Sequence, residues 1–424
     1  MLLLPRLLRR IVQVGTLELR GPGGFVEVIE GKGDGPRVTI TIKDPSLDWK
    51  IPLNAELAAA EAYMDGRMEV GPDGATSLME LIFRNKRAFD MSASQVFWRG
   101  LGRRLRRFMQ HNALTPARRN VRHHYDLGNA FYAKWLDWDM QYSCAYYPTG
   151  QETLEEAQTA KKRHIAAKLM LEPGQRVLDI GSGWGGLALY LAAVADVEVV
   201  GVTLSEEQLA LARRRAEAAG LSDKVRFELR DYREIDARFD RIVSVGMLEH
   251  VGIGHLDGYF RTVRRLLAPD GVALVHSISS ADPPSTTGPF LRKYIFPGGY
   301  APCLSEATQS VERAGLWSLD SEIWRVHYSR TLRAWLDRFM AVRADIVAMY
   351  DERFARMWEF YLAACEAAFL HGSAMVFQLQ LGRQRDAVPL HRDYIGEAEA
   401  RLKVAEQTML PRLRRATEGL DLAA

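Results

Sequence analysis

A run of glycines in the middle of the chain offers a place where a ligand can lie against bare backbone. The sequence from Val177 to Gly186 reads VLDIGSGWGG, an apolar stretch that turns through glycines. Leu187, Leu189 and Leu191 follow it and are typical of a helix that packs on the preceding strand. Glycines there allow tight turns and let a ligand approach N–H groups closely. Because any strand–turn–helix joint favours glycine, the stretch alone also fits a joint that binds nothing.

Further strands and helices alternate after this turn and predict the elements that position it. Apolar, β-branched runs predict strands at residues 197–203, 225–229, 239–245 and 271–278. Ser205 offers an N-cap for the helix after the first of these strands, and residues 259–267 are a helical segment. The sequence therefore predicts a doubly wound, mostly parallel α/β sheet, with a ligand outside the carboxyl ends of its strands.

The order of these features is similar to that of the S-adenosylmethionine (SAM) methyltransferases. The glycine motif, the tip of the second strand, Asp231-Tyr232 and Glu249-His250 follow one another as they do in those enzymes. The layout is less similar to that of a dinucleotide dehydrogenase. The resemblance implies a seven-stranded, Rossmann-like sheet.

Composition limits the class of protein. The chain has 424 residues, 47% of them hydrophobic, and a net charge of +3. This length suits a large catalytic domain with a smaller one, and the apolar content excludes global disorder. The small net charge gives no argument for nucleic acid as a partner. Three cysteines predict no disulfide framework and so a reducing compartment, and no metal site is expected.

The membrane signals in the sequence are those of a surface contact. No apolar run reaches the ~18 residues that a membrane span needs. The start, MLLLPRLLRR, is typical of an amphipathic terminus and lacks the cleavage site of a signal peptide. We therefore expect a cytoplasmic protein.

The first 115 residues predict a small α+β accessory domain. Short alternating runs predict strands at 16–19, 26–29 and 38–42, and helices are expected at 55–64 and 78–83. This part carries no cluster of acids, bases or nucleophiles, which favours a packing or accessory role. We place the boundary before Pro116, so that the chain divides into residues 1–115 and 116–424.

Residues 97–109 combine apolar side chains at helical spacing with many arginines. The apolar positions are Trp98, Leu101, Leu105, Phe108 and Met109, and the arginines are Arg99, Arg103, Arg104, Arg106 and Arg107. Such a segment suits an anionic membrane surface, which makes the N-terminal domain a candidate for lipid contact. The alternative is a linker helix that docks its apolar face on its own domain. Gly100 and Gly102 weaken it as a free-standing helix.

Several separated motifs show which family the chain resembles. They are NVRHHYDLGN at 120–129, MQYSCAY at 140–146, GMLEHVG at 246–252, VHSI at 275–278, KYIFPGG at 293–299 and HY at 327–328. Together with VLDIGSGWGG and GVTLSEEQ, this set closely resembles the cyclopropane-fatty-acyl-phospholipid synthases, including the mycolic acid cyclopropane synthases, over residues 118–385. The resemblance implies addition of the SAM methyl carbon across a cis double bond of a phospholipid acyl chain.

That reaction sets clear requirements on the site. An alkene that attacks the sulfonium methyl becomes a carbocation, and a base must then remove a proton from the transferred methyl so that the ring closes. Water would quench the cation, so the site needs a dry apolar channel. Electron-rich groups that face the cation would stabilise it.

In the family a bound bicarbonate ion acts as this base, and the resemblance assigns its site. The matching positions here are Cys144, Glu249, His276, the backbone of Ile278, and Tyr328. Tyr328 and His276 can donate hydrogen bonds to bicarbonate, and Glu249 can accept its O–H. Taken singly, Cys144 and His276 also fit ordinary core packing. Cys365 matches a further family cysteine, but the chemistry needs no thiol nucleophile and we favour packing as its role.

The resemblance also assigns the SAM-binding residues. The complete predicted set is Tyr142, Ser143, Asp179, Gly181, Ser182, Gly183, Thr203, Leu204, Ser205, Gln208, Asp231, Tyr232 and Arg233. The glycine turn would hold the methionine end of SAM, with Tyr142 and Ser143 covering it. Thr203 stands where many methyltransferases have an acid, and we expect it to share the ribose hydroxyls with Gln208. Tyr232 and Arg233 would contact the adenine, and at these two positions the family often has Trp-Glu.

The rest of the chain gives coarser expectations. Residues 294–299 form an apolar, turn-rich insert that fits a wall of the acyl channel or ordinary core packing. Long amphipathic helices are expected at 332–349 and 353–370, and 377–381 predicts an antiparallel strand at the sheet edge. A charged helix at 398–413 fits a solvated face or a subunit contact, so a homodimer is possible.

Alternatives to the synthase remain open at this stage. A fatty-acyl methylase with a methyl-branched or methylene product shares the first chemical step and differs in the fate of the cation. A methyltransferase for a small soluble compound would need neither the arginine-rich segment nor the bicarbonate residues. A lipid-binding protein with a relic SAM fold would not bind SAM. The partners we expect are unsaturated phospholipid acyl chains and an anionic membrane, met peripherally at its inner face.

Overall fold

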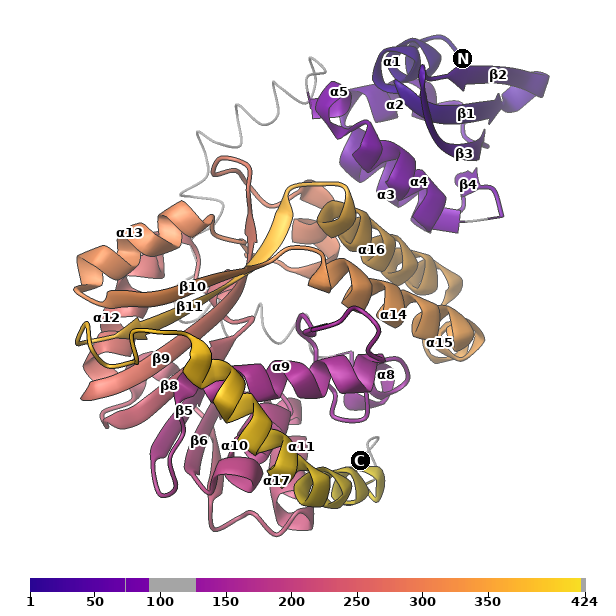
Figure 1. Cartoon of the computed structure of the whole chain (residues 1–424). Coiled ribbons are helices and arrows are strands. Elements are labelled where there is room, and N and C mark those ends of the chain that lie inside the picture. Colours follow the sequence, from indigo (N-terminus) through magenta and orange to yellow (C-terminus); the bar gives the residue numbers. More distant parts are fainter. Residues whose placement is uncertain (73, 91–126, 421–424) are drawn as a thin grey trace. The chain divides into compact units, whose positions relative to one another are not determined.

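The computed structural model describes residues 1–72, 74–90 and 127–420 (Figure 1). These residues form two compact units. The first unit joins residues 1–90 with Ser285–Pro297 and Tyr328–Ala374, and the second consists of residues 127–284, Gly298–His327 and 375–420. The predicted boundary before Pro116, the arginine-rich segment at 97–109 and residues 120–126 of the first family motif lie outside the described residues, so these stay predictions.

The second unit is built on a seven-stranded sheet with the order β10-β11-β9-β8-β5-β6-β7. Its strands are β5 (Arg176–Ile180), β6 (Glu198–Thr203), β7 (Val225–Leu229), β8 (Phe239–Val245), β9 (Leu267–Ser280), β10 (Trp317–Trp324) and β11 (Ala374–Gly382). The pairs β5–β6, β6–β7, β5–β8 and β8–β9 are parallel, and β10–β11 is antiparallel. The predicted doubly wound, mostly parallel α/β sheet is therefore confirmed, and each predicted strand is present.

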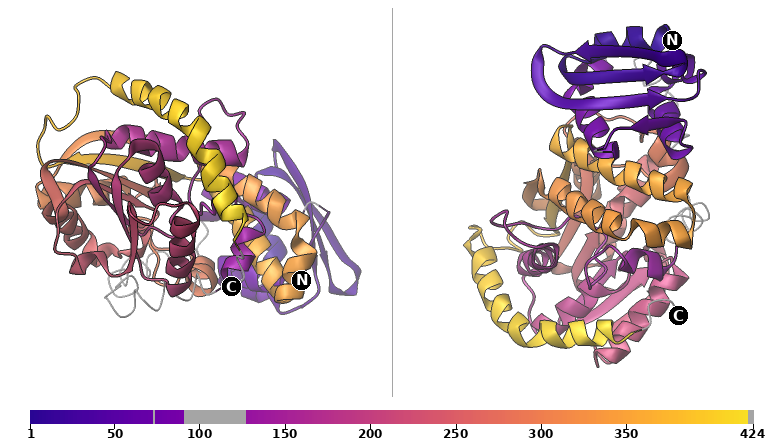
Figure 2. Two further views of the ribbon diagram at one scale, coloured as in Figure 1. Left: turned by 90° about the horizontal axis from the view of Figure 1, so that it is seen from below. Right: turned by 90° about the vertical axis from the view of Figure 1, so that its right-hand side faces the viewer.

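Helices cover both faces of this sheet (Figures 1 and 2). The helices of the unit are α8 (Asn129–Ala133), α9 (Leu154–Leu169), α10 (Gly186–Ala195), α11 (Glu206–Ala218), α12 (Leu256–Leu266), α13 (Leu304–Ala314) and α17 (Asp393–Glu418). Successive residues of β5 point to opposite sides. Val177 packs in one core cluster with residues of α9, α10, α11 and α17, whereas Leu178 packs in another with α12 and α13. The apolar runs read from the sequence are thus strands buried on both faces.

The edge of the sheet differs from the prediction. β11 is antiparallel as expected, but it lies between β9 and β10 and is not the edge strand. The edge is β10, which was not predicted from the sequence. Its residues are mostly exposed or half-buried, with Trp317 52% exposed. An edge strand with one solvated face has little apolar patterning to reveal it.

The first unit contains a second, four-stranded sheet with the order β2-β1-β3-β4. Its strands are β1 (Val14–Gly21), β2 (Phe25–Glu30), β3 (Gly33–Ile42) and β4 (Met68–Val70), and its N-terminal helices are α1 (Leu3–Ile11), α2 (Leu47–Leu53), α3 (Ala55–Met64), α4 (Gly74–Arg84) and α5 (Lys86–Asp90). β1 pairs antiparallel with β2 and parallel with β3. The predicted strands and helices of the small α+β part are all present.

Two later segments of the chain complete the first unit. They contain the short helical turn Leu291–Ile295 and the helices α14 (His327–Ala341), α15 (Arg343–Met349) and α16 (Glu352–Leu370). The Tyr63 hydroxyl of α3 donates to Glu359 Oε1 of α16 at 2.6 Å. The Tyr63 ring also lies 5.7 Å from that of Phe360. α16 therefore packs on the N-terminal helices. No helix of the described residues is long and apolar enough to cross a membrane.

Candidate functional site

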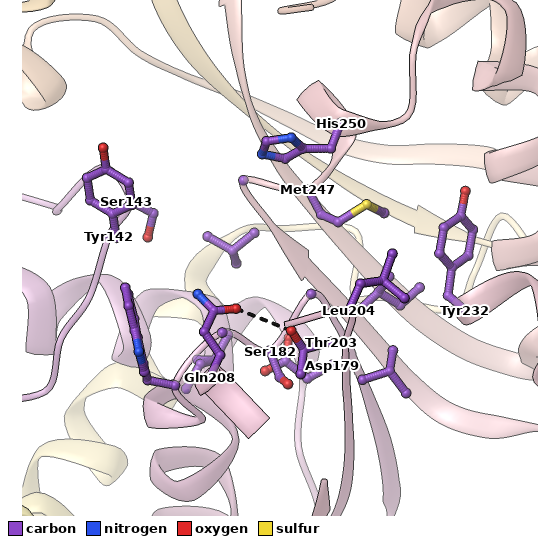
Figure 3. Close-up of a pocket in the computed structure, with 18 of the residues that line it drawn as sticks. Tyr142, Ser143, Asp179, Ser182, Thr203, Leu204, Gln208, Tyr232, Met247 and His250 are labelled. Atoms are coloured by element: carbon purple, nitrogen blue, oxygen red, sulfur yellow. Dashed lines mark hydrogen bonds between the residues drawn. The ribbon is translucent and has the colours of Figure 1, made fainter. Parts of the chain in front are cut away.

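A pocket lies at the carboxyl ends of the parallel strands of the second unit (Figure 3). Ile180 ends β5 and Gly181 follows it, Thr203 ends β6, and Val245 ends β8. This is the edge of a doubly wound sheet where ligands are expected to bind. All of the predicted cofactor-binding residues line this pocket except Ser205.

The glycine turn after β5 needs glycine for steric reasons. Gly181 has φ +83°, and a Cβ at that position would lie 2.9 Å from Cγ of Met247. A Cβ on Gly186 would lie 2.4 Å from the side-chain nitrogen of Gln141. The turn thus packs closely against two other walls of the pocket, and larger residues would close it.

Thr203 and Gln208 meet directly, as the predicted sharing of a role requires. The Thr203 hydroxyl donates to Gln208 Oε1 at 3.2 Å, and both side chains line the pocket (Figure 3). Ser205 has a different task, because its Oγ accepts the backbone N–H of Gln208 at 3.3 Å. Ser205 is therefore the N-cap of α11, as predicted from the sequence. It does not line the pocket.

Two buried polar atoms of the pocket have no hydrogen-bond partner among the described residues. They are Oδ2 of Asp179 and Oγ of Ser182. Burial raises the pKa of the Asp179 carboxyl to about 7. Buried polar groups in proteins are normally satisfied, so these atoms point to a polar ligand. SAM fits this requirement, because its ammonium group and ribose hydroxyls supply the missing donors.

The pocket is long enough in one direction to separate two ends. Tyr142 and Ser143 lie on one side in Figure 3, Tyr232 lies on the opposite side, and Thr203 is between them. At the Tyr232 end, Arg233 Nη2 pairs with Asp231 Oδ2 at 2.7 Å. Which end holds the methionine part of SAM and which the adenine stays a prediction.

Several residues of the pocket were not predicted from the sequence. Lys161 of α9 lines it, and so do Met247 and His250. Burial lowers the pKa of His250 to about 4, so its ring is neutral at pH 7. Met247 and His250 flank Glu249 in the motif GMLEHVG, so their place in that motif was a signal. Nothing in the sequence marked Lys161.

Glu249 and Ile278, predicted to lie together, are joined by a hydrogen bond. The Ile278 N–H donates to Glu249 Oε1 at 2.6 Å. The other carboxylate oxygen, Oε2, is buried and has no partner among the described residues. Burial raises the pKa of Glu249 to about 7. A carboxyl that has one unpartnered oxygen and gains or loses its proton near neutral pH fits a bound anion with an O–H group, and bicarbonate is one.

His276 is held in one tautomer by a buried amide. Gln378 Oε1 accepts a hydrogen bond from Lys168 Nζ at 3.3 Å, and Gln378 Nε2 lies 3.2 Å from His276 Nδ1. Because an ammonium group only donates, the amide oxygen faces Lys168 and the amide N–H faces Nδ1. The proton of the ring is therefore on Nε2. Burial lowers the pKa of His276 to about 3, so the ring is neutral.

The three remaining predicted catalytic residues lie in different settings. Cys144 is fully buried in the second unit, with Sγ 3.3 Å from the Ala145 carbonyl oxygen. Tyr328 and Cys365 belong to the first unit, on α14 and α16. Burial raises the pKa of the Cys365 thiol to about 12, which disfavours the nucleophilic thiolate. The joining of Cys144, Glu249, His276 and Ile278 with Tyr328 at one site stays a prediction.

The seven-stranded sheet and the pocket at its carboxyl edge define a SAM-dependent methyltransferase. The family model for mycolic acid cyclopropane synthetase matches residues 112–379. The chain therefore belongs to the mycolic acid cyclopropane synthetase family.

The matches to two full-length relatives cover more of this chain than the family model does. The cyclopropane-fatty-acyl-phospholipid synthase of Escherichia coli K12 is 39% identical over 356 residues, 81% of this chain and 87% of that protein. A probable fatty acid methyltransferase of Pseudomonas putida is 36% identical over 354 residues, 82% and 87% of the two chains. The solved mycolic acid cyclopropane synthase CmaA1, complexed with SAH and CTAB, is 32% identical with a TM-score of 0.58. That match covers 62% of this chain and 97% of CmaA1.

Proposed function

We propose that this protein is a cyclopropane-fatty-acyl-phospholipid synthase, which transfers the SAM methyl carbon to a cis double bond of a phospholipid acyl chain. The observation that carries the proposal is the 39% identity to the synthase of Escherichia coli over most of both chains. The unpartnered Oε2 of buried Glu249 supports bicarbonate as the base, because it fits an anion that carries an O–H group.

In this proposal the chain's own residues bind and orient the reactants. When bound, SAM would supply the methyl carbon and bicarbonate would supply the base. The Nε2–H of His276 would donate to the anion, while Glu249, itself fixed by the Ile278 N–H, would hold its O–H. The Tyr328 hydroxyl would give a further donor. Cys144, which is fully buried, would help to keep water from this side of the site.

The test is a product analysis on lipid vesicles. The purified protein is incubated with SAM and vesicles of cis-unsaturated phospholipid, and the acyl chains are then examined by mass spectrometry and NMR. The proposal expects acyl chains heavier by one CH2, with cyclopropane proton signals that survive catalytic hydrogenation. Turnover should fall when carbon dioxide and bicarbonate are removed from the buffer and return when bicarbonate is added. Vesicles that stay unmodified while SAM still binds would overturn the assignment.

A second product is favoured by one relative. The Pseudomonas putida protein of similar identity is named a probable fatty acid methyltransferase. A methylene product has the same mass as a cyclopropane but loses its double bond on hydrogenation. A reduced methyl branch is heavier by two further hydrogens and requires a reductant. The same vesicle assay therefore separates the three outcomes.

The membrane contact belongs to the proposal as well. We place the protein at the cytoplasmic face of an anionic inner membrane, because its substrate is a bilayer lipid and residues 97–109 are rich in arginine. Replacing Arg103, Arg104, Arg106 and Arg107 by Ser should weaken vesicle binding most at low salt, where charge attraction is least screened. Sedimentation with anionic and neutral vesicles measures this, and unchanged binding would remove the segment from the proposal. Light scattering would test the expected homodimer.

A further inference from the structure

One buried lysine of the pocket forms no ion pair with a carboxylate of the described residues. Lys161 lies on α9, is 1% exposed and lines the pocket. Its Nζ donates to Gln141 Oε1 at 2.8 Å and to Ser143 Oγ at 2.7 Å. Both acceptors are neutral, and an ammonium group has a third N–H. No carboxylate among the described residues forms an ion pair with Nζ.

The charges around Lys161 do not balance. It belongs to a buried cluster with Asp137, Asp139, Lys162 and Arg215, each at most 3% exposed. Within the cluster, Asp139 is the ion-pair partner of both Lys162 and Arg215. Asp137 accepts backbone N–H groups of Asp139 and Gln141. Three cations and two carboxylates leave one positive charge, and Lys161 is the cation of this cluster that lines the pocket. A buried charge without a counter-charge is costly, so the cluster lacks one anion.

The other cations of the pocket already have partners. Arg233 pairs with Asp231 at 2.7 Å, and Arg230 lies 3.6 Å from a carboxylate oxygen of Glu228. Lys161 is different because desolvation opposes its charge and lowers its pKa to about 7. An anion placed at its ammonium group would restore the charged form.

We propose that Lys161 binds a carboxylate-type anion of the reaction, which is either the carboxylate of SAM or bicarbonate. The proposal rests on the proposed function, since both anions belong to it. Both are expected close to Lys161, because its partner Ser143 is assigned to the methionine end of SAM. The next residue, Cys144, is assigned to the bicarbonate site.

The first experiment measures binding without turnover. Calorimetry gives the dissociation constants of SAM and of decarboxylated SAM for the wild-type protein and for Lys161→Met, a neutral side chain of similar length. If the anion is the SAM carboxylate, Lys161→Met weakens SAM binding about 10-fold to 100-fold, the range for a hydrogen bond to a charged group. Decarboxylated SAM should then bind both proteins equally. This arm needs no acyl substrate, so it remains informative if the proposed function fails.

The second experiment addresses bicarbonate. If that is the anion, Lys161→Met leaves the affinity for SAM unchanged and raises the bicarbonate concentration for half-maximal turnover at least tenfold. Lys161→Arg keeps the positive charge. It should therefore stay close to wild type both in its affinity for SAM and in the bicarbonate concentration for half-maximal turnover.

Lys162→Met is the matched control. It removes an equally buried lysine from the neighbouring position of α9, where the ammonium faces Asp139 and does not line the pocket. It should leave the ratio of the SAM and decarboxylated SAM affinities unchanged. The proposal is overturned if Lys161→Met weakens both ligands by one factor with no change in the bicarbonate response, because that is simple loss of structure. It is also overturned if neither response changes in a variant that keeps the wild-type melting temperature.

Discussion

At the scale of single residues, two carboxyl groups of the site are held where burial opposes their charge. Asp179 and Glu249 each have one oxygen without a partner among the described residues. Burial raises the pKa of each carboxyl to about 7. Their neutral forms are therefore favoured by the fold, and their charged forms destabilise it unless a bound group supplies a donor. The site is kept ready for ligands at a cost in stability.

Glu249→Gln should make the protein more stable at high pH. A carboxyl with a raised pKa binds its proton more tightly in the folded state, so its contribution to stability is full below pH 4.5 and is lost as the pH rises through 7. Glutamine has no such loss and still accepts the Ile278 N–H. Relative to wild type, the variant should gain about 2.5 kcal/mol in the free energy of unfolding between pH 5 and pH 8.

Urea unfolding at the two pH values measures this difference. Glu397→Gln, a change at an exposed residue of α17, is the control and should show no gain. Glu249→Gln should also lose most of its turnover, while its affinity for SAM changes little. If the difference in the free energy of unfolding between Glu249→Gln and wild type is the same at both pH values, Glu249 is not desolvated in the way that the structure shows.

Gln378 should act through His276. Replacement by Glu places a carboxylate beside Nδ1, which then carries the proton, and Nε2 becomes an acceptor that repels an anion. Gln378→Met leaves the tautomer unfixed. We expect Gln378→Glu to raise the bicarbonate requirement about tenfold or more, Gln378→Met to raise it less, and both to leave SAM affinity nearly unchanged.

Nitrogen NMR of imidazole-labelled protein reads the tautomer directly. The His276 signal, identified by its absence in His276→Asn, should show the proton on Nε2 in the wild type and on Nδ1 in Gln378→Glu. A wild-type signal with the proton on Nδ1 would contradict the assignment, whatever happens to activity.

What the sequence predicted at this scale depended on motif membership. Thr203 and Gln208 were predicted as a pair and are joined by a hydrogen bond. Gln378 and Lys161 stand in stretches that read as an ordinary strand and an ordinary helix. Gln378 contacts His276, 102 residues away in the chain, and Lys161 contacts Gln141, 20 residues away. No local sequence pattern encodes such contacts.

At the scale of elements, local chemistry was a good guide where one element suffices. Ser205 illustrates this, because a serine before two glutamates predicted the N-cap that the structure contains. Its assignment to the cofactor stays a prediction, which is weakened because Ser205 does not line the pocket and its Oγ is used by the helix. β10 was missed because its half-exposed residues carry no clear period, and its place at the edge is fixed by pairing with β11.

Ser205→Ala should therefore affect the helix more than the ligand. Loss of the cap leaves the N–H of Gln208 without its partner and should lower the free energy of unfolding by about 1 kcal/mol. The dissociation constant of SAM, measured by calorimetry, should change by no more than about twofold, which corresponds to a few tenths of a kcal/mol in binding free energy. Thr203→Val is the comparison, because it removes a hydroxyl that lines the pocket and should weaken SAM more. A larger loss of affinity in Ser205→Ala would restore Ser205 to the cofactor site.

At the scale of the whole molecule, the first unit is assembled from distant parts of the chain. Tyr63 and Glu359 are 296 residues apart and share a buried hydrogen bond. The sequence predicted the helices on both sides of this contact but not their pairing, because an amphipathic pattern shows which face of a helix is buried and not which element covers it. CmaA1 is matched over 97% of its length by 62% of this chain, so a related fold exists with less chain.

Removal of the first 115 residues should therefore destabilise the remainder of this protein. α16 would lose its cover from α3 and α4, which exposes Phe360 and leaves the buried carboxylate of Glu359 without its tyrosine partner. Each large apolar side chain returned to water costs about 1.5–3 kcal/mol. The shortened chain, residues 116–424, should melt at a clearly lower temperature and bind a hydrophobic dye. Tyr63→Phe in the full chain, which keeps the ring and removes only the hydrogen bond, should lose about 1–3 kcal/mol and bind no dye. A shortened chain with the melting temperature of the full protein would show that α16 needs no cover from the N-terminal helices.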